Sequence, residues 1–99
     1  MSYELRFDSK ARKEWEELDF GVRTRCLKVL ARRLENPHVI ADALSSDLAG
    51  CYKIKLGKSG HRLIYTVVES SQTLFVLSVG KRADMAAYRA AILRILDSD

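Results

Sequence analysis

The 99-residue sequence predicts one α+β domain, spanning residues 1–99, with helices packed on a mostly antiparallel four-stranded sheet. Short runs of alternating or continuous apolar residues occur once near the N-terminus and three times after residue 50, which is typical of strands. Helical periodicity fills the region between them and returns at the C-terminus. The expected order is β-α-α-β-β-β-α, with a helical hairpin and a C-terminal helix on the sheet.

The first strand and the helical hairpin are expected within residues 3–35. Tyr3, Leu5 and Phe7 alternate with charged residues, which predicts a strand with one buried face. A first helix should follow directly. A second helix is expected over residues 22–35, where apolar residues recur at helical spacing, and Asn36-Pro37 should end it. Two consecutive helices of this kind pack as a hairpin.

The second half should contain three strands joined by short turns. Three runs rich in β-forming residues are expected to be these strands: 51–56, 62–68 and 73–79. The first two flank Gly57-Lys58-Ser59-Gly60, which is a hairpin signal, and the third is apolar enough to be central. A last helix should begin at a cap formed by Asp84 and end near Leu96. Residues 39–50 fit either a short helical turn or a packed loop.

Positive charge is concentrated on the predicted sheet. No acidic residue lies between Asp47 and Glu69, and residues 48–83 carry six Lys or Arg against one Glu, a balance of +5 in a chain of net charge +4. These cations are Lys53, Lys55, Lys58, Arg62, Lys81 and Arg82. Such a surface usually binds a polyanion, most often nucleic acid. A solvated face that protects the sheet edge is the alternative interpretation.

Four of the cations and one aromatic residue form the candidate catalytic set. Lys53 and Lys55 lie two residues apart on one predicted strand, so their side chains leave the same face about 6–7 Å apart. Arg62 begins the partner strand, and Arg82 follows the end of another strand. Tyr88 falls in the first turns of the last helix, where it could stack on a base or pack in the core. Three further residues are candidate nucleic-acid contacts: Lys58, His61 and Lys81.

Residue sets for other chemistries are missing from the sequence. There is no carboxylate pair in the basic region, no nucleophile elbow, no phosphate-cradling Gly loop and no metal-ligand spacing, so we expect neither metal nor cofactor. Cys26 and Cys51 should be buried and unpaired. No apolar run reaches the roughly 20 residues of a membrane span, and the N-terminus lacks a signal-peptide core. We therefore expect a cytoplasmic protein without a membrane partner.

Three motifs resemble, in their order, those of the RelE family of bacterial toxins. They are Cys51-Tyr-Lys-Ile-Lys-Leu, Ser59-Gly-His-Arg-Leu-Ile-Tyr65 and Ser78-Val-Gly-Lys-Arg82, with Tyr88 beyond. The similarity covers roughly residues 2–96 and implies the RelE-like microbial RNase fold. It also implies a ribosome-dependent endoribonuclease that cuts mRNA at the A-site codon. By this resemblance the family's catalytic cations match Lys53, Lys55, Arg62 and Arg82, and its base-stacking tyrosine matches Tyr88.

The resemblance further implies a chemistry and a set of partners. RNA can be cut without a metal because its own 2′-hydroxyl attacks the adjoining phosphate, which leaves a 2′,3′-cyclic phosphate and a 5′-hydroxyl. The implied partners are a cognate RelB-like antitoxin, mRNA, and the ribosomal 30S A site with its rRNA. His61 departs from the family, where a tyrosine is usual; it is a solvated turn residue or a proton-transfer group beside Arg62.

Two rival interpretations remain open from the sequence. One is a toxin of the same fold that inhibits DNA gyrase, as ParE relatives do. The other is a nucleic-acid-binding module without catalysis. A translation assay set against a supercoiling assay separates the first rival, and mapping of mRNA 3′ ends separates the second.

Overall fold

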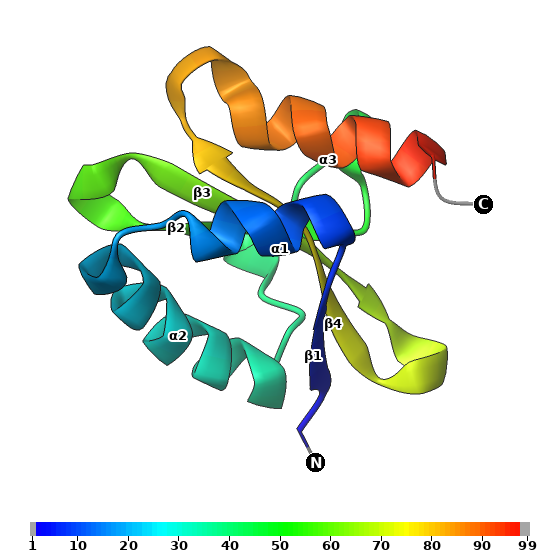
Figure 1. The fold of residues 1–99 in the computed structure, drawn as a ribbon. Coiled ribbons are helices and arrows are strands. Elements are labelled where there is room, and N and C mark those ends of the chain that lie inside the picture. The colour runs from blue at the N-terminus through cyan, green and yellow to red at the C-terminus, as the bar shows by residue number, and fades with distance from the viewer. Residues whose placement is uncertain (1, 98–99) are drawn as a thin grey trace.

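A computed structural model describes residues 2–97, apart from the side chain of Asp84. The elements follow the predicted order (Figure 1). They are β1 (Glu4–Phe7), α1 (Ser9–Glu16), α2 (Phe20–Glu35), β2 (Cys51–Lys55), β3 (His61–Val68), β4 (Thr73–Lys81) and α3 (Ala86–Asp97). The helix α2 begins two residues earlier than expected. The cap expected from Asp84 concerns a side chain outside the described part of the structure.

The four strands form one mixed sheet in the order β1-β4-β3-β2. The pairs β2–β3 and β3–β4 are antiparallel and β1–β4 is parallel, so the predicted mostly antiparallel sheet is confirmed. The central position predicted for residues 73–79 is also confirmed, since β4 lies between β1 and β3. The short strand β1 pairs with β4 only from Thr73 to Val76, so it leaves the rest of that edge of β4 unpaired by a strand.

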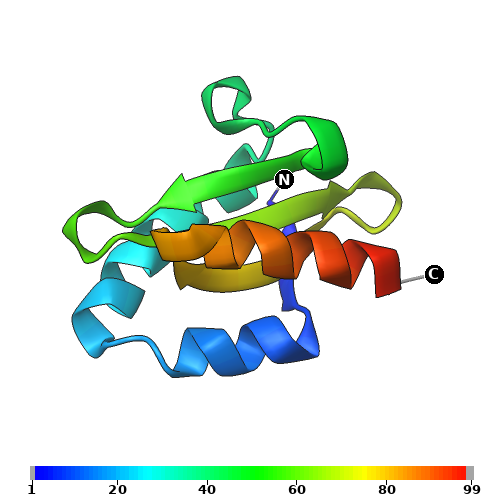
Figure 2. The same cartoon turned by 90° about the horizontal axis from the view of Figure 1, so that it is seen from above.

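Helices cover both faces of the sheet (Figures 1 and 2). The hairpin of α1 and α2 packs on one face through a core that includes Trp15, Leu30 and Tyr65. The helix α3 packs on the other face, where a second core contains Cys51 and Ile64. Because neighbouring strand residues point to opposite faces, the residues in these two cores show on which face each of the remaining strand residues lies.

The cysteines are buried as small apolar side chains, as predicted. Burial raises the pKa of the Cys26 thiol to about 12 and also raises that of Cys51. Such thiols are poor nucleophiles, so neither cysteine is a candidate for catalysis. None of the helices in the described chain has the length and hydropathy that a membrane span requires.

The segment over residues 39–50 combines both predicted alternatives. It forms two 3₁₀ turns, η1 (Ile40–Asp42) and η2 (Ser46–Leu48), and its Ala43 bridges to β2. A buried polar cluster ties the segment to the sheet: Tyr65 donates a 2.7 Å hydrogen bond to the Pro37 carbonyl and accepts one of 3.0 Å from Arg33. Arg33 also forms a 2.6 Å ion pair with Asp42. The end of α2 is therefore fixed against β3.

Candidate active site

Three of the predicted catalytic cations share one face of the sheet. Lys55 lies directly opposite Arg62 in the β2–β3 register, and Lys53 lies opposite Ile64. Ile64 is buried under α3, and so is Cys51 at the start of the same alternation. Lys53, Lys55 and Arg62 therefore project from the α3 side of the sheet. Directly opposed residues of an antiparallel pair have Cβ atoms only about 4.5–5.5 Å apart, so the two strands bring their cations together.

The fourth cation, Arg82, lies at the same end of the sheet. This end contains the end of β2, the beginning of β3 and the end of β4, and the turn η3 (Gly57–Ser59) with Lys58 crosses it. The Arg82 backbone N–H donates a 2.6 Å hydrogen bond to the Gly60 carbonyl, which ties the residue after β4 to the β2–β3 turn. Gly60 has a φ of 75°, a left-handed conformation that glycine adopts without a steric penalty. Lys58 and Arg82 are both exposed at this rim.

Tyr88 lies on the helix that covers the cation-bearing face. Its ring is half-buried against the second core and lines an open cleft of about 270 Å³ with the η2 segment. The packing on the core agrees with the core interpretation, and stacking on a base stays a prediction.

The close approach of α3 to the sheet depends on Gly80, which lies opposite Arg62. A Cβ atom added to Gly80 would come within 3.2 Å of the Ala87 backbone nitrogen. Nearby, the Ser78 hydroxyl donates a 2.6 Å hydrogen bond to the Ala87 carbonyl. The first turn of α3 is thereby held beside the strand that ends at the cations.

The structure places His61 and Lys81 on the opposite face. They are paired across β3 and β4, and their side chains line an open cavity of about 210 Å³ with Glu14 and Glu17 of the α1 side. Burial and the nearby Lys81 charge lower the pKa of His61, and Asp19 opposes this shift. The Nδ1 atom of His61 is buried and has no hydrogen-bond partner among the described residues. His61 is therefore next to Arg62 in the sequence, but the two side chains lie on opposite faces of the sheet.

The cation-bearing face has no carboxylate partner among the described residues. Within that part of the chain, the side-chain nitrogens of Lys53, Lys55, Lys58 and Arg82 form no ion pair or hydrogen bond with another side chain, and Arg62 donates only to the His61 carbonyl. Among the side chains that the structure describes, no group of three or more His, Cys, Asp or Glu could hold a metal ion. The site can therefore bind phosphate and stabilise developing negative charge, which is electrostatic chemistry.

Comparison with known proteins assigns the family. Residues 5–86 match the family model described as the ParE toxin of the type II toxin–antitoxin system parDE. The chain is 45% identical to the mRNA interferase toxin RelE of Escherichia coli K12, over 97% of this chain and 100% of that protein. The chain belongs to the RelE/ParE toxin family.

Solved structures of RelE agree with this assignment. A free-state structure of a doubly substituted E. coli RelE has a TM-score of 0.87 and 43% identity, covering 96% of this chain and 99% of that chain. In the crystal structure of the intact E. coli RelBE toxin–antitoxin complex, the matched chain has a TM-score of 0.77 and 45% identity, with coverage of 81% and 96%. The predicted α+β fold of a RelE-like toxin is thus confirmed.

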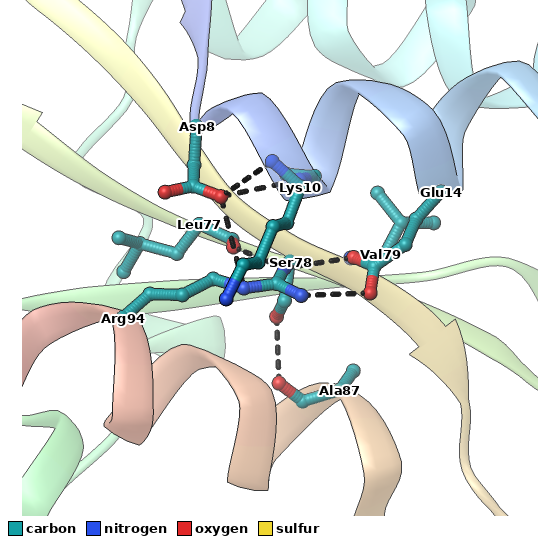
Figure 3. Close-up of polar contacts among 9 residues, drawn as sticks. Asp8, Lys10, Glu14, Leu77, Ser78, Val79, Ala87 and Arg94 are labelled. Carbon is teal, nitrogen blue, oxygen red and sulfur yellow. Dashed lines mark hydrogen bonds and ion pairs between the residues drawn. The ribbon is translucent and has the colours of Figure 1, made fainter. Parts of the chain in front are cut away.

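Sequence patterns in this RelE/ParE-family chain did not identify the residues that hold α3 in place. They are Glu14 of α1, Ser78 and Gly80 of β4, and Arg94 of α3, and most of their contacts appear in Figure 3. The sequence signals were weak: a serine within an otherwise apolar strand, and an arginine within a largely apolar helix. Neither signal identifies a partner, because Glu14 and Arg94 are 80 positions apart in the chain.

Proposed function

We propose that this RelE/ParE-family toxin is an endoribonuclease that cuts mRNA in the ribosomal A site and needs no metal. The observation that carries the proposal is the shared face of Lys53, Lys55 and Arg62, with Arg82 at its rim and Tyr88 on the covering helix. The full-length similarity to a protein named mRNA interferase toxin supports it. Because this activity acts on mRNA and ribosomes, we place the protein in the cytoplasm.

The proposed reaction uses the RNA's own nucleophile. The 2′-hydroxyl oxygen of one nucleotide forms a bond to the adjoining phosphorus, and the bond from that phosphorus to the 5′-oxygen of the next nucleotide breaks. Lys53 or Lys55, in its neutral amine form, accepts the 2′-hydroxyl proton, and a solvent water supplies the proton that the leaving 5′-oxygen takes up. Arg62 and the second lysine stabilise the charge that develops on the phosphorane. Arg82 acts electrostatically on the leaving oxygen, because a guanidinium rarely gives up its proton.

Alignment of the codon supplies much of the proposed rate. Among the described residues, no carboxylate pairs with the cations of this face and His61 lies on the other face, so little beyond charge and position can accelerate the reaction on free RNA. The ribosome would hold the strand in one geometry, and Tyr88 would stack on a codon base within it. Lys58 is proposed to contact nucleotides beside the cleaved one. Lys81 and His61, on the other face, are proposed to contact ribosomal RNA around the end of the sheet.

Two adjacent residues test the assignment. We expect Arg62→Ala to slow single-turnover cleavage on mRNA-programmed ribosomes by about 100-fold or more, the range found when a donor to a developing oxyanion is removed. His61→Ala, which removes only a proposed contact to ribosomal RNA, should stay within about threefold of wild type at saturating toxin, because alternation in a strand directs its side chain to the face opposite the reacting phosphate. Wild-type cleavage by Arg62→Ala, or equal losses in both variants, would remove the catalytic role of the face. Inhibition of gyrase without codon-phased cuts would instead support the ParE-like activity.

A RelB-like antitoxin is the proposed regulator. Two of the similar solved structures contain E. coli RelE bound to its antitoxin: the intact RelBE complex and a complex with a RelB peptide. The concentration of unpaired cations on one face suits an acidic antitoxin segment, since opposite charges steer association. Coexpression with any short reading frame that lies beside the gene should restore growth and protein synthesis, and failure of every such frame to do so would count against this partner.

A further inference from the structure

The edge of β4 changes its partner half-way along. The parallel strand β1 ends at Phe7, which is paired with Val76. Beyond that point the Leu77 carbonyl and the Val79 N–H face an edge that no strand of the described chain occupies. A buried strand edge without hydrogen-bond partners is costly, so the fold must satisfy these groups in another way.

Two charged side chains take the place of the missing strand. Glu14 of α1 accepts a 3.0 Å hydrogen bond from the Val79 N–H, and Arg94 of α3 donates a 2.8 Å hydrogen bond to the Leu77 carbonyl. Arg94 also binds both carboxylate oxygens of Glu14, at 2.8 and 2.9 Å (Figure 3). Its side chain is only 12% exposed, and its Nε atom lies 3.7 Å from an Asp8 oxygen.

This pair joins the two faces of the sheet. Glu14 comes from the helical hairpin and Arg94 from α3, so their contact passes around the open edge of β4 and links three elements. The bidentate geometry fixes orientation as well as distance. Removing one partner would leave a largely buried charge and a backbone group without partners, so the contact strongly favours one placement of α3.

The first turn of α3 has its own anchor, at Ala87, where Ser78 donates to the backbone and Gly80 allows close approach. Tyr88 is the next residue along the helix, and Arg94 lies further along the same helix. Two separated contacts fix both the position and the rotation of a helix, whereas a single contact lets the helix turn about that point. Without Arg94, the helix would keep its first-turn anchor and its apolar packing but could turn about its own axis, and such a turn would move the Tyr88 ring across the face of the sheet.

We infer that Arg94, held by Glu14 across the open edge of β4, is a positioning residue that sets where Tyr88 stands relative to Lys53, Lys55 and Arg62. The inference rests on the proposed function, because the position of Tyr88 matters to the reaction only if its ring stacks on a codon base. Arg94 itself lies at the far edge of β4 from these cations, so it acts through the helix and not on the RNA.

Stacking can be measured without cleavage. Ribosomes would be programmed with mRNA that carries 2-aminopurine at one A-site codon position at a time and 2′-O-methyl groups that block the nucleophile. Saturating wild-type toxin should quench the fluorescence at one position, and Tyr88→Ala should abolish that quench. Arg94→Gln should lose most of the quench while its half-saturating concentration stays within about threefold of wild type. The matched control is Arg89→Gln, an exposed arginine on the same helix, which should quench as wild type does.

Cleavage rates supply the second arm. On unmodified mRNA, Arg94→Gln should lower the maximal single-turnover rate by about 10- to 100-fold, the size expected when a reacting group is displaced by about 1 Å. In a Tyr88→Ala background the same substitution should change the rate by less than about twofold. Glu14→Gln, which removes the charge of the partner, should reproduce the Arg94→Gln pattern.

The outcomes separate the inference from the proposed function. Full quench and wild-type rate in Arg94→Gln, or losses that multiply with those of Tyr88→Ala, would overturn the inference alone. In Arg94→Gln, hydrogen exchange should show faster opening of α3 while β3 and β4 stay protected. Loss of protection throughout the sheet would show a structural role of Arg94 and overturn its role as a positioning residue. A wild-type toxin that neither quenches nor cuts on any codon would instead overturn the proposed function.

Discussion

The division of cations between two faces predicts how RNA affinity depends on salt. Each phosphate neutralised on a single strand contributes about −0.7 to the slope of log K against log salt. Five cations lie on or at the rim of the α3 side: Lys53, Lys55, Lys58, Arg62 and Arg82. Their combined slope should be about −3.5, which weakens binding about 100-fold between 50 and 200 mM salt. Lys81 lies on the opposite face and should not contribute.

Anisotropy titrations with a short 2′-O-methyl RNA, repeated at several salt concentrations, measure this slope directly. Lys55→Gln should reduce its magnitude to about 2.8, whereas Lys81→Gln should leave it near 3.5. Both variants remove one exposed lysine charge, so net charge cannot explain a difference between them. A flat salt response, or equal changes in the two variants, would refute the assignment of the α3 side as the phosphate-binding surface.

Two further predictions concern stability. Burial lowers the pKa of His61, so the His61 imidazole binds a proton more readily in the unfolded chain than in the folded protein. The free energy of unfolding is therefore unaffected by this group above pH 6.5, its ordinary pKa, and decreases as the pH falls below that value. Urea unfolding of wild type and His61→Gln from pH 7 to 5 should show the decline in wild type alone, and parallel curves would contradict it. Tyr65→Phe removes two hydrogen bonds, one to the buried Pro37 carbonyl and one from the Arg33 guanidinium, and should lower the free energy of unfolding by about 1–3 kcal/mol. Tyr3→Phe, which removes only an exposed hydrogen bond to Glu69, should change it little; equal effects would reject the cluster.

Local patterns were sufficient to predict the central part of the site. The period of two in a strand places Lys53 and Lys55 on one face, and a short turn returns the chain so that Arg62 meets them. The same rule separates His61 from Arg62. These relations depend on residues close in sequence, which is why strand alternation and turn length alone are enough to predict them.

The face of Lys81 could not be predicted in this way. The β3–β4 register pairs Ile64 with Ser78 and Tyr65 with Val76, so Leu77 is an extra residue in β4. This bulge places both Leu77 and Ser78 toward α3 and reverses the alternation beyond them. Without the bulge, Lys81 would lie on the same side as Leu77. One additional residue in a strand therefore decides which face a distant cation occupies.

Contacts between distant segments were equally hidden. The parallel pairing of β1 with β4, and the ion pair between Glu14 and Arg94, join the two ends of the chain. Each depends on where β1 stops along β4, and no periodicity in the sequence encodes that point. The anchoring of the helix that carries Tyr88 is consequently a property that only the assembled fold reveals.

The source of the nucleophile tests the account most directly. Ribosomes would be programmed with an mRNA in which the nucleotide before the cleaved bond carries either a ribose or a 2′-deoxyribose. We expect the ribose substrate to give a 2′,3′-cyclic phosphate and a 5′-hydroxyl, and the 2′-deoxy substrate to remain uncut at that bond. Cleavage of the 2′-deoxy substrate at a comparable rate, or a product that bears a 5′-phosphate, would contradict catalysis by a cation-bearing face that activates the RNA's own hydroxyl.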